Sequence, residues 1–359
     1  MSPPLKSAAG NRGRANGTPG LIALAGVFIL SFDFELAWGT RANATAANHA
    51  AGVEATREVV GALLHRLDHH GVSATWATVG HLMLDPVDNP RDWHYTPAPS
   101  PDWFRGDWFE GVPAGDDPAA GRYYAPELVQ AIVDCPTHQE LASHTFSHPV
   151  LAEVECPASI ARAELEACRQ AARRFGRELT SLVFPRNQIG HLNVVAGTGH
   201  NCFRGPFNEW YWRGDDGDAL RGSRVGGIKR LTARLLRFAD ECLALTPKVG
   251  AARQVAGLCE IPHGMFFPGS VGLSRFVPAR CKTAKAVRGL TAAAASDRVF
   301  SLFTHPHNFL PDIKANLTAF DRILGRAAAM RDEGKLVIQT RAEHASEVLG
   351  SDTTEVAAA

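Results

Sequence analysis

The 359-residue sequence lacks several features, and each absence excludes a class of protein. Neither sign of charge is in excess, because lysine plus arginine and aspartate plus glutamate both number 37. We therefore expect neither a nucleic-acid partner nor an anionic membrane partner. No apolar run reaches the ~18 residues that a membrane span requires. No repeat of fixed period is visible.

Cysteines are scattered, odd in number and never spaced as Cys-x-x-Cys. A disulfide framework or a zinc-thiolate site is therefore not expected, and the cysteines fit reduced thiols in a cytosolic protein. The seven are Cys135, Cys156, Cys168, Cys202, Cys242, Cys259 and Cys281.

The N-terminal region allows two interpretations. Basic residues precede the apolar run 21–30, as in a signal peptide. Cleavage at the first small-residue site beyond it, near 42–44, would remove Asp33 and Glu35, which are assigned to the active site below. A buried first strand explains the same run without that loss. We therefore expect a disordered leader over residues 1–20 and a cytoplasmic protein.

Short apolar runs alternate with amphipathic helices along most of the chain. The expected strands are 27–32, 72–79, 181–184, 258–261, 299–304 and 336–339. The expected helices are 53–70, 158–175, 230–243, 313–331 and 342–349. This alternation favours an α/β protein with a mainly parallel sheet or barrel. We expect one domain over residues 21–350, followed by a flexible tail over 351–359.

A long insertion interrupts the alternation at residues 85–124. It is dense in proline, glycine and aspartate, but its aromatic residues argue against disorder because such side chains bury large areas. A lid over an active site and packing against the rim of the barrel explain it equally well. The aromatics are Trp93, Tyr95, Trp103, Phe104, Trp108, Phe109, Tyr123 and Tyr124.

Four polar clusters follow expected strands, at the end where the loops of a barrel build its active site. They are 31–35 (SFDFE), 144–149 (HTFSHP), 184–188 (FPRNQ) and 303–308 (FTHPHN). Two histidines four apart can bind one metal ion, and a carboxylate completes the set while leaving positions open. A second carboxylate can then act as a base, and a remote histidine can protonate a leaving amine.

The 144–149 cluster matches in full the His-Ser/Thr-x-x-His-Pro motif of a known family. Residues 72–80 (VSATWATVG) resemble the second strand of that family, and 300–305 resembles the strand that ends in its late catalytic histidine. Over roughly residues 22–345 the sequence is therefore similar to the polysaccharide deacetylase family, the NodB homology domain of carbohydrate esterase family 4. The resemblance implies a distorted (β/α) barrel of about seven strands and metal-assisted amide hydrolysis of N-acetylated sugars.

The first motif of the family departs here from its usual Thr-Phe-Asp-Asp-Gly. The resemblance implies that Asp33 is the catalytic base, but Phe34 occupies the place of the metal ligand. Alternate strand residues share a face, so Glu35 is the expected substitute, as in a divergent Asp-x-Glu branch. The other interpretation is that Glu35 orients His144 or His148.

The resemblance also implies roles for the remaining candidates. The metal ligands would be Glu35, His144 and His148. Arg186 stands where the family has Arg-x-Pro-Tyr and is expected to keep Asp33 ionised, unless it forms an ordinary structural salt bridge. His305 is the expected general acid, with His307 as its rival. The expected substrate contacts are Asn187, Arg204, His307 and Trp38, the last near a backbone N–H that would stabilise an oxyanion.

These expectations predict a metal-dependent hydrolase that removes acetyl from an N-acetylated sugar, sugar nucleotide or polysaccharide. The expected cofactor is a divalent metal, with Zn²⁺ preferred, while Co²⁺ and Ni²⁺ suit the same geometry. Alternatives are an O-acetyl esterase, a non-sugar amide or cyclic imide hydrolase on the same fold, and an inactive glycan-binding homologue. The expected partner is a small-molecule or glycan substrate, and the oligomeric state is left open.

Overall fold

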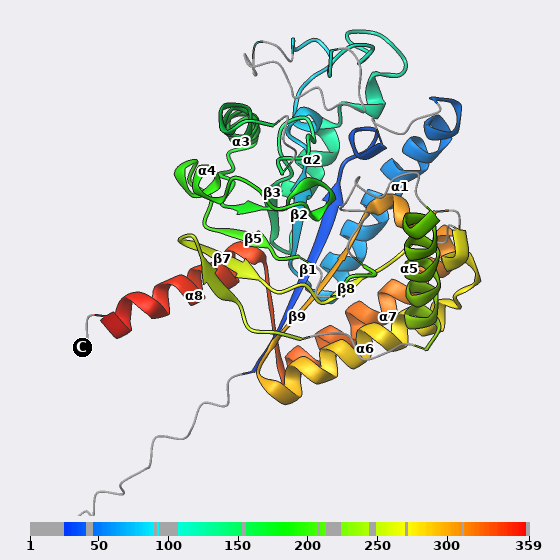
Figure 1. Cartoon of the computed structure of the whole chain (residues 1–359), viewed down its shortest axis with the longest axis vertical. Coiled ribbons are helices and arrows are strands. Elements are labelled where there is room, and N and C mark those ends of the chain that lie inside the picture. The colour runs from blue at the N-terminus through cyan, green and yellow to red at the C-terminus, as the bar shows by residue number, and fades with distance from the viewer. Residues whose placement is uncertain are drawn as a thin grey trace, which may run out of the picture.

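The computed structural model describes most of the chain (Figure 1). The described residues are 25–40, 46–89, 92, 107–152, 156–206, 209–212, 224–243, 249–269, 272–310 and 312–356. The leader predicted for residues 1–20 lies outside them. So do four aromatic residues of the insertion, namely Trp93, Tyr95, Trp103 and Phe104.

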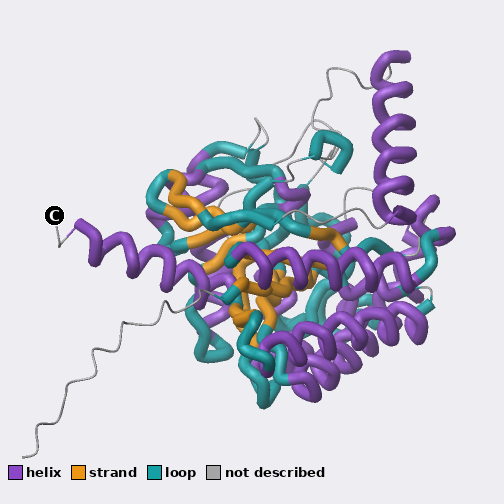
Figure 2. The backbone as a smooth tube through the Cα atoms, turned by 90° about the horizontal axis from the view of Figure 1, so that it is seen from below, coloured by secondary structure: helices purple, strands orange, loops and turns teal. Residues whose placement is uncertain are grey.

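The described strands form one curled, ten-stranded sheet (Figure 1). In spatial order they are β6 (Arg253–Val255), β7 (Leu258–Ile261), β5 (Cys202–Arg204), β4 (Ser181–Leu182), β3 (Gln139–Ser143), β2 (Ala74–Thr78), β1 (Gly26–Phe34), β9 (Val299–Thr304) and β8 (Met265–Phe266), with β10 (Leu336–Gln339) paired to β1. Every pair among these strands is parallel except β6–β7. Figure 2 shows the helices lying around the strands, so this is the predicted distorted (β/α) barrel.

The described helices include the five that were expected and three additions, the longest of which is Ala279–Ser296. The α-helices are α1 (Ala46–His70), α2 (Pro126–Val133), α3 (Ala158–Arg173), α4 (Leu192–Gly197), α5 (Arg224–Leu243), α6 (Ala279–Ser296), α7 (Ile313–Asp332) and α8 (Arg341–Val356). The short 3₁₀ helices include η1 (Trp38–Thr40), η2 (Gly80–Met83), η4 (Ala120–Arg122), η5 (Pro185–Asn187), η7 (Gly272–Phe276) and η8 (Pro306–Phe309). The sequence did not predict α2, α4 or α6, and α8 extends into the predicted tail. None of the described helices has the length and apolar character needed to span a membrane.

The central strand β1 is buried on both faces, and its alternation decides what lies inside the barrel. Phe28, Leu30, Phe32 and Phe34 belong to the large core between the sheet and the helices, where the Phe32 ring lies 4.4 Å from that of Trp76. The odd-numbered residues point the other way, because successive strand side chains alternate between faces. Asp33 and Glu35 thus reach the rim of the barrel together.

The described part of the insertion packs against that rim. Trp108 is buried and donates its indole N–H to the Ser147 carbonyl oxygen at 2.9 Å. The Tyr123 ring lies edge-on to Trp38 with centroids 5.4 Å apart, and Tyr124 is also buried. Of the two explanations for the insertion, packing against the rim therefore holds for these residues.

Candidate active site

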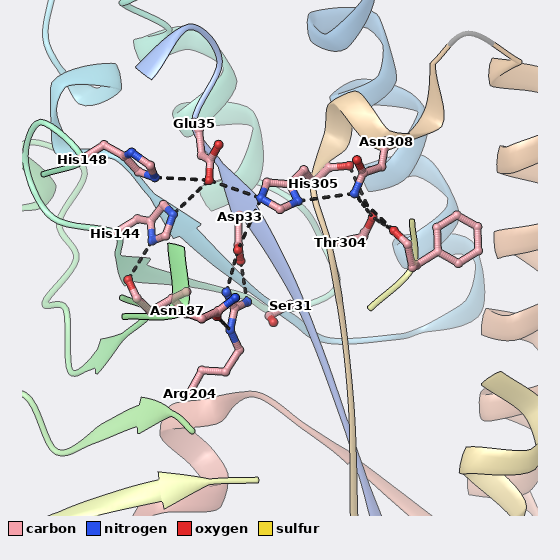
Figure 3. A network of polar contacts seen from close by, with 12 residues as sticks. Ser31, Asp33, Glu35, His144, His148, Asn187, Arg204, Thr304, His305 and Asn308 are labelled. Carbon is pink, nitrogen blue, oxygen red and sulfur yellow. Dashed lines mark hydrogen bonds and ion pairs between the residues drawn. The ribbon is translucent and has the colours of Figure 1, made fainter. Parts of the chain in front are cut away.

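The polar clusters meet at the carboxyl ends of parallel strands, as the sequence predicted for a barrel. Glu35 directly follows β1, His144 directly follows β3, and His305 directly follows β9. Figure 3 shows these side chains turned toward one another, with Asp33 below Glu35. All four are buried or nearly so.

Glu35, His144 and His148 converge as a candidate metal centre. Their ligand atoms all lie within 4.8 Å of one another. The Glu35 carboxylate oxygen Oε1 is 3.1 Å from His144 Nε2 and 3.4 Å from His148 Nε2. Burial raises the pKa of Glu35, but the imidazoles of His305 and His148 outweigh it and hold this pKa well below its usual range. Glu35 is therefore an anion facing two ring nitrogens.

The hydrogen bonds of the two histidines fit a bound cation. His144 Nδ1 lies 2.7 Å from the Val183 carbonyl oxygen, which can only accept, so Nδ1 carries the proton. When the ring is neutral, the lone pair on Nε2 therefore faces the Glu35 oxygen. Both atoms are electron-rich, so a proton or a cation is required between them. His148 Nε2 is buried and has no hydrogen-bond partner among the described residues. Burial also lowers the pKa of His148, which keeps it neutral, as a metal ligand must be.

Gly39 makes room for the Glu35 carboxylate. A Cβ atom at position 39 would collide with Glu35 Oε2. Only glycine lets the η1 turn pass this close to the carboxylate. The position of Glu35 beside His144 and His148 thus depends on the absence of a side chain at position 39, which no motif in the sequence indicates.

Asp33 is held by Arg204, and the expectation for Arg186 was wrong. Arg204 donates from Nη1 and Nη2 to the two Asp33 oxygens, both at 2.7 Å. Burial raises the pKa of Asp33, but Arg204 and His305 lower it to about 2. Arg186, with a left-handed φ of 55° in η5, is exposed, and besides burial its charge helps to lower the pKa of His148 instead.

Two of the expected substrate contacts are buried and occupied. Arg204 is 2% exposed and holds Asp33, and its Nε donates to Asn187 Oδ1 at 2.8 Å. Trp38 is 1% exposed, its indole N–H donates to the Tyr123 carbonyl oxygen, and its backbone N–H donates to the Glu35 carbonyl oxygen. The substrate-contact predictions for Arg204 and Trp38 are corrected accordingly. Asn187 lies behind Arg204 and orients it.

His305 lies between the two carboxylates. Its Nε2 is 3.3 Å from Glu35 Oε1 and 3.6 Å from Asp33 Oδ2. Burial lowers the pKa of His305, but Glu35 and Asp33 raise it above the ordinary value, which favours the protonated ring. The ring of His307 lies next to it, with centroids 4.8 Å apart. His305 is therefore the histidine in contact with the expected base and ligand.

Asn308 sets the orientation of the His305 ring. Its Nδ2 donates to the Phe267 carbonyl oxygen at 3.2 Å. Because a carbonyl oxygen can only accept, this bond identifies the amide atom there as the nitrogen. The same Nδ2 lies 3.3 Å from His305 Nδ1. In the neutral ring, the proton therefore belongs on Nε2, the atom that faces the site.

A second group of possible ligands consists of Asp33, Glu35 and His305. Both Asp33 oxygens already accept hydrogen bonds from Arg204, however, and its charge would oppose a cation at Asp33. The Glu35 carboxylate accepts no bond from a guanidinium of a described residue, although the His305 ring lies 3.3 Å from its Oε1. The geometry favours the set of Glu35, His144 and His148 over the other.

Solved structures with the same architecture are similar to this chain over most of its length. One is assigned as a polysaccharide deacetylase from Mycobacterium smegmatis, with a TM-score of 0.56 and 15% identity over 91% of each chain. Another, with the same assignment, comes from Pseudomonas aeruginosa PAO1, with a TM-score of 0.52 and 12% identity over 89% of this chain and 88% of that one. This chain has the polysaccharide deacetylase fold.

The resemblance predicted from the 144–149 motif is thereby confirmed at the level of the fold. No protein-family model matches the sequence, and no curated protein matches it either. At these identities the likeness extends to the fold alone, so the assignment of roles rests on the side chains themselves.

The histidine loop of this deacetylase fold is held by Glu164, which the sequence analysis did not identify. Glu164 Oε2 accepts hydrogen bonds from the backbone N–H groups of Phe146 and Ser147, both at 2.8 Å, and Oε1 accepts from Ser147 Oγ at 2.6 Å. Thr145 and His148 adopt left-handed φ values of 62° and 64°, which cost energy in non-glycine residues. The buried carboxylate thus stabilises a strained turn between the two histidines.

Glu164→Ala is expected to weaken zinc binding by about 10–100-fold, as is typical when a partner that orients metal ligands is lost. Two buried N–H groups lose their acceptor, so the free energy of unfolding should also fall by ~1–3 kcal/mol. Glu164→Gln should restore most of the affinity, because an amide oxygen can still accept both N–H bonds. Chelator competition measures the zinc affinity.

The matched control is Glu166→Ala, whose side chain is exposed on the same helix. It should change neither zinc affinity nor stability. If Glu164→Ala lowers the stability but leaves the zinc affinity intact, Glu164 only stabilises the fold and does not position the histidines.

Proposed function

We propose that this chain is a metal-dependent hydrolase that removes the acetyl group from an N-acetylated sugar, sugar nucleotide or polysaccharide. The observation that carries the proposal is the convergence of Glu35, His144 and His148 beside the Asp33–Arg204 pair and His305. A candidate metal centre with a separate carboxylate and a separate histidine supplies each group that amide hydrolysis requires.

Glu35, His144 and His148 would hold the metal, with Zn²⁺ preferred for a site of two imidazoles and one carboxylate. A divalent cation bound there would polarise the acetyl carbonyl and lower the pKa of water. Water with a lowered pKa is easier for Asp33 to deprotonate, and Asp33 needs this help because a carboxylate with a pKa of about 2 is a weak base.

The roles of the other groups follow from their positions. Asp33 accepts a proton from the attacking water at a carboxylate oxygen, and Arg204 keeps that carboxylate oriented and ionised. His305 donates a proton from Nε2 to the leaving nitrogen. The raised pKa of His305 supports this role because it favours the protonated ring, and Nε2 is the ring nitrogen that faces the two carboxylates.

The test is deacetylation by zinc-loaded protein of a panel of N-acetylated sugars, UDP-linked N-acetyl sugars and chitin-type oligosaccharides. We expect release of acetate from at least one member, loss of activity on chelation and recovery on adding zinc. Parallel assays with O-acetylated sugars separate the esterase alternative, which predicts turnover of the esters and none of the amides.

The metal is tested separately from turnover by a ligand variant and a matched control. His148→Ala should abolish stoichiometric zinc binding, measured by metal analysis, together with activity. His138→Ala removes an exposed histidine and should change neither. A protein that purifies without zinc, binds none on titration and resists chelators would contradict the proposal and favour the inactive glycan-binding alternative. The cytoplasmic location stays a prediction.

A further inference from the structure

Helix α5 turns an apolar face outward. Ile228, Leu231, Leu235 and Leu243 are 67%, 57%, 53% and 66% exposed. Residues spaced by three, four or eight positions share one side of a helix, so these four form one stripe. Figure 1 shows α5 at the edge of the molecule, on the side of α6 and away from the sheet.

The buried face of α5 carries Ala233 and two acidic residues in place of the leucines. Asp240 is buried and accepts from Lys285 Nζ of α6 at 2.6 Å and from the Trp212 indole N–H at 3.1 Å. Glu241 is buried beside it. These contacts fix the leucines on the solvent side.

Two further exposed apolar side chains lie on η7, which packs against α5. Leu273 and Phe276 are 42% and 60% exposed, and the Arg275 guanidinium lies 4.7 Å above the Phe276 ring. We call this combined area the α5 surface. It consists of Ile228, Leu231, Leu235, Leu243, Leu273 and Phe276.

The charges that flank the leucine stripe of α5 are positive. By helical periodicity Lys229 lies on one side of the stripe and Arg234 on the other, and both are exposed. Neither forms an ion pair with a carboxylate of a described residue, and the acids of α5 face inward. The balanced net charge of the whole chain, from which we expected no anionic membrane partner, does not reveal this local excess.

We propose that the α5 surface docks on an anionic lipid bilayer. A helix with a leucine-rich face and flanking Lys and Arg side chains lies in the membrane interface, with its leucines among the acyl chains and its cations at the phosphates. Two copies of the chain meeting symmetrically through this face would bring their basic flanks together, which disfavours a dimer. This inference concerns location and does not depend on the proposed chemistry.

Co-sedimentation of the full chain with vesicles tests the proposal. We expect binding to vesicles of phosphatidylcholine mixed with phosphatidylglycerol, weaker binding at high salt, and little binding to phosphatidylcholine alone. The double variant Leu231→Gln, Leu235→Gln should bind the mixed vesicles about tenfold or more weakly, because two partly inserted leucines are lost. Lys229→Gln with Arg234→Gln should weaken binding to the anionic vesicles specifically.

Val87→Gln is the control, since it removes an apolar side chain elsewhere that is even more exposed than the two leucines. It should bind like the unmodified chain. Failure of the unmodified chain to bind anionic vesicles, or equal binding by the double leucine variant, would overturn the proposal. A change from dimer to monomer in the double variant would also overturn it, because a second copy then covers the face.

Discussion

Asp33→Asn is expected to lower deacetylation by about 10²–10⁴-fold while zinc binding is retained, because it removes the proton acceptor but keeps the shape of the side chain. The prediction depends on Asp33 not being a metal ligand. Both of its oxygens accept hydrogen bonds from Arg204, and the favoured ligand group consists of Glu35, His144 and His148. Zinc content and the acetate release rate are measured on the same preparation.

Glu35→Gln is the contrasting variant, and it should lose zinc. If Asp33→Asn loses zinc while Glu35→Gln retains it, the roles of the two carboxylates are exchanged. Asp33→Asn also leaves the buried Arg204 without its counter-charge, so we expect a lower Tm. The assays are therefore run well below the unfolding midpoint.

The lowered pKa of Asp33 also predicts how the free energy of unfolding depends on pH. A carboxyl group whose pKa is lower in the folded than in the unfolded state stabilises the fold at pH values above its unfolded pKa. This stabilisation is lost as the pH falls through the folded pKa. For Asp33 this window lies between the ordinary value of 3.8 and about 2. Asp33→Asn should therefore remove part of the acid-induced loss of stability in that window.

His305→Ala is expected to reduce amide hydrolysis by about 10²–10⁴-fold, but to reduce hydrolysis of an ester with a good leaving group much less. An amine needs protonation as it leaves, whereas an activated alkoxide does not. Because the carboxylates raise the pKa of His305, its proton remains available at higher pH and is lost as the pH rises through that pKa. Rates on matched amide and ester substrates measure the difference.

Equal losses on both substrates would mean that His305 positions the site and does not donate the proton. His307→Ala is the control, because its ring lies next to that of His305 but is not the one between the carboxylates. A large loss confined to His307→Ala would transfer the acid role to that residue.

Local patterns in the sequence were enough to predict most of the described strands, though not β3, and to bring together the candidate ligands. The strands at 299–304 and 336–339 have the expected bounds, since short apolar runs between turn residues leave little choice of structure. Alternation along β1 placed Asp33 and Glu35 on one face, and the spacing of His144 and His148 placed them together. Each of these features depends only on the sequence of a single short segment.

Only the tertiary structure decided which distant groups meet. The order of strands brings Arg204 of β5 to Asp33, while Arg186 is exposed in a left-handed turn, and both arginines follow apolar runs in the sequence. Helical periodicity alone does not tell which of Glu164 and Glu166 faces the histidine loop. Nor does it show that the leucines of α5 face solvent, because the buried side of a helix is set by what packs against it.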